Sequence, residues 1–127
     1  MKVSRLDHLV LTVADIDATT AFYTEVLGMT AVDFDDGRKA LNFGSSKINL
    51  HLAGHEFEPK ALRPTPGSAD LCLVVDDPLA EVVATLERSG VAIEVGPVER
   101  SGAIGQMLSV YLRDPDANLI ELSNYLT

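Results

Sequence analysis

The chain contains two similar halves, and this internal repeat restricts the folds it can adopt more than any other feature. Each half has an apolar run, then a helical pattern, then a glycine. His8 and Gly28 are 20 positions apart, as are Asp70 and Gly90. In a repeat protein, each copy is one supersecondary unit that needs a neighbour to bury its apolar face. The sequence therefore predicts two copies of one motif.

The two halves also end alike, in Asn49–Leu52 and Leu119–Leu122. The offset between them is 62 residues at their starts and 70 at their ends. We therefore expect an insertion of eight residues in the second half. It fits best in a long loop at Val98–Met107, where Ser101, Gly102 and Gly105 favour irregular backbone.

Both halves contain the signals that begin and end a helix. Asp77 followed by Pro78 predicts an N-cap and a first helical residue, and the earlier helix opens at Asp15 or Asp17. Gly28 and Gly90 stand where helices commonly end. The expected apolar helix faces are Ala18, Phe22 and Val26 in the first helix, and Leu79, Val82, Val83 and Leu86 in the second.

Three strand-like segments follow each helix, and turn residues separate them. The expected strands are Thr30–Phe34, Lys39–Phe43 and Lys47–Leu52 in the first half, and Ala92–Val95, Leu108–Leu112 and Asn118–Ser123 in the second. The proline-containing segment His55–Ser68 separates the halves. The sequence thus predicts an α+β fold in which two tandem βαβββ modules, at about 4–54 and 68–127, form a curved mixed sheet within a single domain of residues 1–127.

Composition narrows the function classes. The 127 residues carry a net charge of −9, with no compensating basic run, which argues against nucleic-acid binding and agrees with simple solubility. No apolar run approaches the roughly 18 residues of a membrane helix, and the first residues do not resemble a signal peptide. The single cysteine, Cys72, fits a reducing cytosol. We therefore expect a cytoplasmic protein without nucleic-acid or membrane partners.

Four polar side chains are expected on the faces of their strands that lie opposite the aliphatic residues. Side chains alternate along a strand, so Leu9 and Leu11 packing on the helices directs His8 to the other face. The same argument applies to His51, Asp70 and Glu121. Imidazole nitrogens and carboxylate oxygens together suit Zn, Ni, Fe or Mn.

Simpler interpretations exist for these residues taken singly. A histidine at a strand start is often solvated, and Asp70 follows a turn sequence. Glu121 is harder to explain structurally, because a buried carboxylate without a partner is costly. The repeat ties the four together, and on that basis we predict one divalent-metal site.

Three motifs resemble the vicinal oxygen chelate superfamily over essentially the whole chain. They are Asp7–Val13, Ala21–Met29 and Arg113–Leu122. Further matches resemble the branch that contains glyoxalase domain-containing protein 5 and its bacterial relatives: Arg38–Gly44, Asn49–His51, Glu56–Ala61, Pro66–Ser68 and Ile120–Tyr125. The superfamily includes glyoxalase I, fosfomycin-resistance enzymes, extradiol dioxygenases and bleomycin-resistance proteins.

The resemblance implies paired βαβββ modules around a metal, with ligands on the first and last strand of each module. These positions fall on His8, His51, Asp70 and Glu121. His51 stands where glyoxalase I usually has Glu or Gln, and Asp70 where it usually has His. Alternatively, two histidines and Glu121 would form the facial set of non-haem iron oxygenases, with Asp70 as an outer group or a base. Ala117 replaces the usual turn glycine.

The resulting hypothesis is a metal-dependent glyoxalase-type lyase or isomerase, or a dioxygenase, acting on a small oxygenated substrate. Asp70 and Glu121 are the candidate catalytic groups. Arg100, Ser109 and Tyr111 are candidate substrate contacts, and Arg100 suits an anion. The resemblance also implies a homodimer, with the site formed within one chain or across two.

Two other functions remain open. One is a metal-free ligand-sequestering protein of the bleomycin-resistance kind, although such proteins generally lack a full ligand set. The other is a degenerate module that acts through protein interaction. Cys72 shares the face of Asp70 and is expected to be a small core residue.

Overall fold

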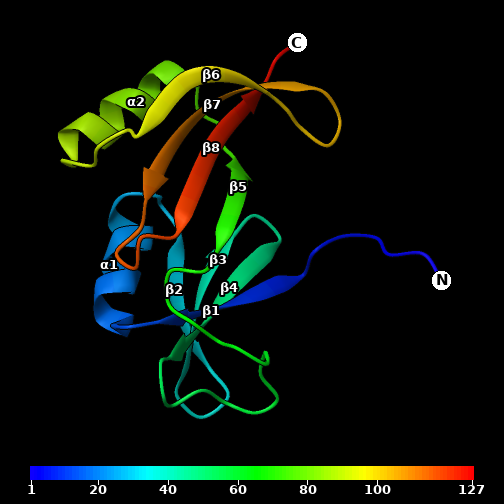
Figure 1. The fold of residues 1–127 in the computed structure, drawn as a ribbon, viewed down its shortest axis with the longest axis vertical. Coiled ribbons are helices and arrows are strands. Elements are labelled where there is room, and N and C mark those ends of the chain that lie inside the picture. Colours follow the sequence, from blue (N-terminus) through cyan, green and yellow to red (C-terminus); the bar gives the residue numbers. More distant parts are fainter. The chain divides into compact units, whose positions relative to one another are not determined.

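The structure, a computed structural model, describes all residues, 1–127. The chain forms two compact units, Met1–Gly67 (unit 1) and Ser68–Thr127 (unit 2). Each unit has the predicted βαβββ order (Figure 1). Unit 1 contains β1 (His8–Val13), α1 (Ile16–Glu25), β2 (Thr30–Phe34), β3 (Arg38–Phe43) and β4 (Ser46–Leu52); unit 2 contains β5 (Asp70–Val74), α2 (Leu79–Arg88), β6 (Val95–Ser101), β7 (Gln106–Arg113) and β8 (Leu119–Tyr125).

Each unit has a four-stranded mixed sheet, and the strand order is the same in both. The orders are β1-β4-β3-β2 and β5-β8-β7-β6. The first and last strands of each module pair in parallel, and the remaining neighbours are antiparallel. This arrangement confirms the expected α+β fold of tandem βαβββ modules.

Burial agrees with the aliphatic faces predicted for β1, β4, β5 and β8. Fully or almost fully buried aliphatic residues line one side of each sheet: Leu11, Val13, Leu41, Ile48 and Leu50 in unit 1, and Val110, Leu112, Ile120 and Leu122 in unit 2. Burying a side chain of this size contributes about 1.5–3 kcal/mol. The polar side chains of the same strands are therefore fixed on the opposite face.

Helix α1 begins where one of the two predicted caps stands, but its buried face differs from the expected one. The Asp15 side chain accepts a hydrogen bond from the Ala18 backbone N–H at 2.9 Å. Thr19 and Tyr23 are buried, whereas Ala18 is exposed. Thr19 is buried without loss of a hydrogen bond, because its hydroxyl donates to the Asp15 carbonyl at 2.9 Å.

Helix α2 corrects the predicted cap at Asp77. The N-cap is Pro78, and the helix receives no cap from a side chain of its own. Asn124 of β8 supplies it instead: its Oδ1 accepts from the Leu79 backbone N–H at 2.7 Å. Its amide nitrogen donates to the carbonyls of Val75 and Asp77 at 3.1 and 3.0 Å.

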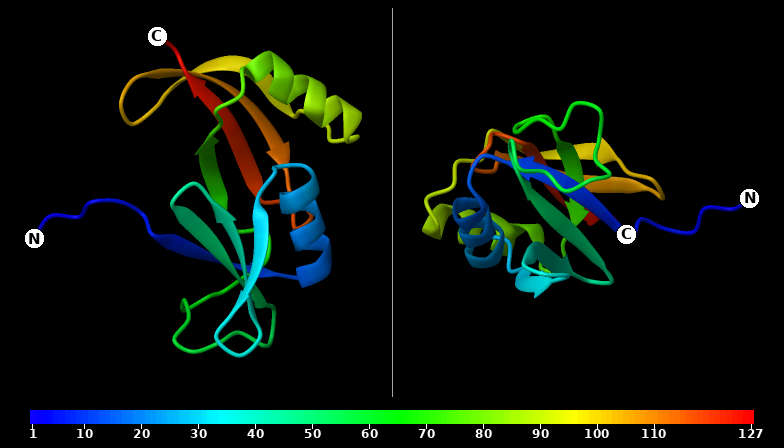
Figure 2. Two further views of the ribbon diagram at one scale, coloured as in Figure 1. Left: turned by 180° about the vertical axis from the view of Figure 1, so that it is seen from behind. Right: turned by 90° about the horizontal axis from the view of Figure 1, so that it is seen from below.

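The long loop expected at Val98–Met107 is wrong, and so is the strand expected at Ala92–Val95. The first four residues of that segment lie in β6 and the last two in β7, and the two strands form a long antiparallel hairpin (Figures 1 and 2, yellow and orange). The β6 residues are mostly exposed, and they show no apolar alternation that would mark a strand. Backbone pairing with β7 forms the strand.

Neither helix has the length and apolar character that crossing a membrane requires.

Candidate metal and substrate site

In unit 2, four predicted site residues line one cavity. Its volume is about 410 Å³, and its lining residues are Asp70, Glu94, Val95, Arg100, Tyr111, Leu119 and Glu121. Tyr111 lies directly opposite Glu121 on neighbouring strands. The predicted carboxylates Asp70 and Glu121 therefore share a cavity with two of the three predicted substrate contacts.

The third predicted contact, Ser109, has a different place. It is fully buried, does not line the cavity, and donates a 2.6 Å hydrogen bond to Glu121 Oε2. Ser123, also fully buried, lies 2.6 Å from Ser109 Oγ and donates to the same carboxylate oxygen at 3.2 Å. The Glu121 carboxylate is thus hydrogen-bonded through one oxygen by two hydroxyls.

Cys72 is exposed, which corrects its expected place in the core. It lies opposite Glu121 on β5, and its Sγ is 3.3 Å from Ser123 Oγ. Partial burial, with a smaller contribution from the Glu121 charge, raises the pKa of the Cys72 thiol. A thiol with a raised pKa is a weak nucleophile near neutral pH.

Two arginines on this face are already oriented by neighbours. Arg100 Nε donates to the Tyr111 hydroxyl at 3.0 Å, and its Nη1 donates to the Glu99 carbonyl at 3.0 Å. Arg113 forms a two-fold hydrogen-bonded ion pair with Glu94, at 3.1 and 3.0 Å, which lowers the pKa of that carboxyl. The Glu94 carboxylate is therefore already paired with Arg113.

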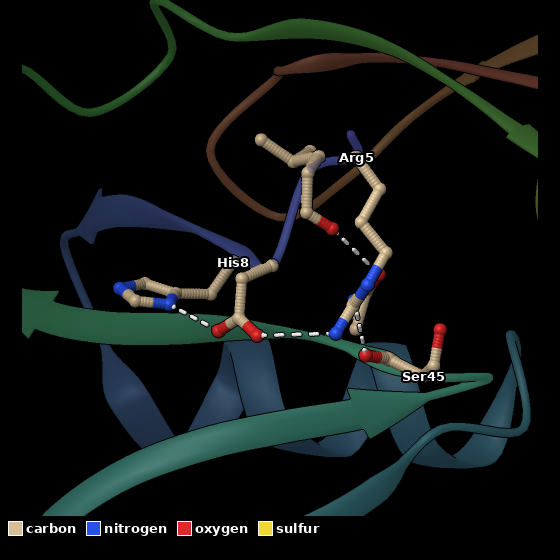
Figure 3. A network of polar contacts seen from close by, with 6 residues as sticks. Arg5, His8 and Ser45 are labelled. Carbon is tan, nitrogen blue, oxygen red and sulfur yellow. Dashed lines mark hydrogen bonds and ion pairs between the residues drawn. The ribbon is translucent and has the colours of Figure 1, made fainter. Parts of the chain in front are cut away.

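In unit 1, His8 is held through one ring nitrogen. His8 Nδ1 lies 2.8 Å from Asp7 Oδ2, and this hydrogen bond lowers the pKa of the Asp7 carboxyl. Arg5 borders the same network and donates to the Ser45 carbonyl at 3.1 Å (Figure 3). Metal-binding histidines commonly donate their second ring N–H to a carboxylate in this way, leaving Nε2 for the ion.

His51 shares the face of His8 but lies farther along the sheet. His8 pairs with Lys47, and His51 stands four residues beyond Lys47 on β4. Four residues correspond to about 13 Å along a strand. The structure therefore does not bring the imidazoles of His8 and His51 together.

Residues of the linker and of β3 surround His51. The His51 ring packs edge-on against Phe57 with centroids 5.5 Å apart, and Arg38 covers the same Phe57 ring at 4.2 Å. His51 is only 6% exposed. Burial, followed by the nearby Arg38 charge, lowers the pKa of His51.

The strand register identifies Asn49, not His51, as the counterpart of Glu121. Glu121 lies opposite Cys72, two residues after Asp70, and Asn49 lies opposite Val10, two residues after His8. The alignment of the ends of the two halves, and with it the predicted insertion length, is therefore wrong by two residues. An available signal was the shared Ile-x-Leu frame around Asn49 and Glu121.

Asn49 also has an unsatisfied polar atom. Its side chain is 9% exposed, and its Oδ1 is buried without a hydrogen-bond partner. A buried carbonyl oxygen without a hydrogen-bond partner lowers the stability of the fold, and a ligand that binds to the oxygen would account for it. Asn49 is thus a functional candidate that sequence reasoning passed over.

The donor chemistry of the two units suits a divalent metal, but neither unit supplies a full set. No three His, Cys, Asp or Glu side chains converge within either unit. In unit 1, the candidate donor is His8, whose Nδ1 contacts the Asp7 carboxylate. In unit 2, the candidate donors are Asp70 and Glu121, and the Glu121 carboxylate is held by hydrogen bonds. Nitrogen and oxygen donors of this kind are typical of first-row divalent ions.

Comparison with known proteins agrees with the fold and the repeat. The model of the Glyoxalase/Bleomycin resistance protein/Dioxygenase superfamily matches residues 5–122. The chain belongs to this superfamily. Within it, the chain is 58% identical to Virulence protein STM3117 of Salmonella typhimurium, over 99% of this chain and 88% of the relative. It is also 58% identical to Glyoxalase domain-containing protein RDO1 of Mycosarcoma maydis, over 98% of this chain and 70% of that protein.

Solved structures extend the comparison. The crystal structure of STM3117 has a TM-score of 0.98 and covers 99% of this chain and 100% of its own. Lactoylglutathione lyase from Agrobacterium tumefaciens is 23% identical with a TM-score of 0.74, covering 97% of this chain and 95% of its own. The antibiotic-binding protein TnmS3 from Streptomyces sp. CB03234 is 24% identical with a TM-score of 0.74, covering 99% of each chain. At these identities, the last two show a shared fold only.

Proposed function

We propose that this protein is a divalent-metal-dependent enzyme of the superfamily, a glyoxalase-type lyase or isomerase or a dioxygenase, acting on a small oxygenated substrate. The observation that carries the proposal is Glu121, whose Oε2 receives two hydroxyl hydrogen bonds while the residue lines a cavity shared with Asp70. The Asp7–His8 pair adds support.

The proposed ligands are His8, Asp70 and Glu121, with a fourth donor from β4. The sequence predicts His51 as the donor from β4 and Asp70 as the fourth ligand or a general base, whereas the register and the unpaired Oδ1 favour Asn49 over His51. We propose that the site forms within one chain or across two chains of a homodimer. A bound ion of this kind supplies Lewis-acid stabilisation of negative charge on substrate oxygens.

The chain's own residues have further roles in this proposal. Arg100 and the Tyr111 hydroxyl, hydrogen-bonded to each other at 3.0 Å, bind and orient an anionic or oxygen-bearing part of the substrate in the cavity. The Asp70 carboxylate, exposed at the start of β5, is the group that accepts and returns a proton if it is not itself a ligand.

The test is elemental analysis of untagged protein purified without chelators. We expect about one first-row metal per chain, and its loss in Glu121→Ala and His8→Ala. Glu87→Ala, which removes an exposed carboxylate from α2, is the matched control and should retain the metal. If the protein retains no metal and takes up none of Zn, Ni, Fe or Mn on addition, the enzyme proposal fails and a metal-free ligand-binding function replaces it.

Two further variants decide the fourth donor. Asn49→Leu keeps the side-chain size and removes the oxygen, so we expect weaker metal retention. His51→Gln should retain the metal. The reverse result would return the fourth position to His51.

We also propose that the chain is related to glyoxalase domain-containing protein 5 and that it forms a homodimer in the cytoplasm. The linker matches at Glu56–Ala61 support the first. Light scattering on purified protein tests the dimer.

A further inference from the structure

The hydroxyl pair beside Glu121 has a role that the proposed function does not itself require. We infer that Ser109 and Ser123 are positioning residues: they hold Glu121 Oε2, so that the carboxylate binds its ligand through Oε1 alone. This inference rests on the proposed function for the identity of the ligand as a divalent metal. The anchoring itself is a property of the metal-free chain.

The contacts form a connected set. Ser109 and Ser123 lie directly opposite each other on β7 and β8, and their hydroxyl oxygens are 2.6 Å apart. Both hydroxyls reach Glu121 Oε2, at 2.6 and 3.2 Å. Both serines are 0% exposed. With no access to water, these hydroxyls depend on each other, on Cys72 and on the carboxylate for their hydrogen bonds.

The surroundings make this pairing specific to Glu121. The residues next to the serines along their strands, Val110 and Leu122, belong to the apolar core. The serine side chains point to the other face of the sheet, where they are also fully buried, and burying two hydroxyls is unfavourable unless a strong acceptor satisfies them. A carboxylate oxygen is such an acceptor, because hydrogen bonds to an ionised group are stronger than those between neutral groups.

Unit 1 lacks this arrangement at the corresponding positions. Register places His51 where unit 2 has Ser123, and Asn49 where it has Glu121. Asn49 Oδ1 receives no hydrogen bond. Anchoring by hydroxyls is therefore a property of the Glu121 side chain and not of the repeated backbone.

Two consequences follow for ligand binding. An anchored carboxylate loses its freedom to rotate before the ligand arrives, so less conformational entropy is lost on binding. Because Oε2 already accepts two hydrogen bonds, Glu121 contributes one oxygen rather than two. Both effects disappear if the hydroxyls are removed.

The test uses Co²⁺ as the probe with Ser109→Ala, Ser123→Ala and the double variant. Outer-shell partners of metal ligands typically contribute 10–100-fold to affinity, so we expect each single variant to bind Co²⁺ about 10-fold more weakly and the double variant up to about 100-fold. The visible absorption of bound Co²⁺ should also weaken, since a freed Oε2 raises the coordination number. Ser101→Ala, at an exposed β6 position, should change neither. Unchanged affinity and spectrum in both single variants would overturn the inference.

A metal-free measurement separates this inference from the proposed function. In protein labelled with ¹³C at glutamate carboxyl groups, Glu121→Gln assigns the Glu121 resonance. We expect Ser109→Ala and Ser123→Ala to move that resonance toward the position of exposed glutamates, while circular dichroism shows an intact fold. A protein that binds no Co²⁺ overturns the proposed function, and the resonance still decides the anchoring. A resonance that does not move shows that the serines do not hold the carboxylate.

Discussion

The backbone of β6 passes so close to β7 that a Cβ atom on Gly96 would lie 2.4 Å from the carbonyl oxygen of Ser109. Gly96 also has a φ of +111°, and it lies in the irregular segment where the β6–β7 register shifts between Val95 and Val98. Only glycine combines this conformation with this approach. The strand that carries Arg100 therefore depends on Gly96.

Gly96→Ala is expected to lower the free energy of unfolding by more than the strain of positive φ alone. Gly37→Ala is the matched control, because Gly37 has a φ of +91° and open space around its missing Cβ. Overpacking costs about 1–3 kcal/mol, so Gly96→Ala should exceed Gly37→Ala by about that amount in urea denaturation. Equal losses would show that β6 shifts without cost.

Asn124→Ala is expected to destabilise unit 2. The substitution removes the acceptor for the first N–H of α2 and the donor for the carbonyls of Val75 and Asp77. Loss of a helix cap typically costs about 0.5–2 kcal/mol. Chemical denaturation, with Asn42→Ala at an exposed β3 position as the control, measures it. A loss no larger than that of the control would contradict the capping role.

The lowered pKa of His51 predicts a specific pH dependence of stability. The reference pKa is 6.5 and the folded pKa lies below it, first because of burial and then because of Arg38. As pH falls through 6.5, the unfolded chain binds this proton before the folded chain does, so the free energy of unfolding decreases. The decrease ends once pH passes the folded pKa.

NMR titration of His51 provides the measurement. Phe57→Ala should uncover the ring and bring its pKa closer to 6.5, and His51→Gln should reduce the loss of stability in weak acid. His55→Gln, at an exposed position, is the control for the second comparison. A His51 pKa that is the same in wild type and Phe57→Ala would show that the linker does not shield the imidazole.

Cys72 is expected to react slowly with iodoacetamide at neutral pH, because its pKa is raised. Part of that rise comes from the Glu121 charge. Glu121→Gln removes the charge and keeps the side-chain size, so the thiol pKa should fall and alkylation at fixed pH should accelerate. Glu87→Gln should have no effect. A pH–rate profile unchanged in Glu121→Gln would mean that burial alone sets the thiol pKa.

Much of the fold follows from local patterns. Alternating residues such as Leu11 and Val13 marked the buried face, and Asp15 and Gly28 marked the ends of a helix. The β6 strand was not predicted because backbone hydrogen bonds, rather than apolar side chains, define it. The N-terminal cap of α2 was not predicted because Asn124, which supplies it, is distant in sequence.

The site was predictable by residue type and less so by position. His8, Asp70 and Glu121 are found on the expected faces, with both carboxylates in the same cavity. The alignment of His51 with Glu121 matched metal-binding residue types and passed over the shared Ile-x-Leu frame, whereas strand register selects Asn49. The cover that Phe57 provides for His51 depends on a linker contact that has no periodic signal.

The contacts from Cys72 to Glu121 also fix the direction of each proton between them. An ionised Glu121 carboxylate only accepts, so Ser109 must donate its proton to Oε2, Ser123 must share its proton between Ser109 and Oε2, and the Cys72 S–H must donate to Ser123. If the thiol ionised, Ser123 would turn toward sulfur, and two oxygen lone pairs would face each other across 2.6 Å. The chain of protons thus has one polarity, and a thiolate at its end could take the Ser123 proton only at the expense of Ser109 and Oε2.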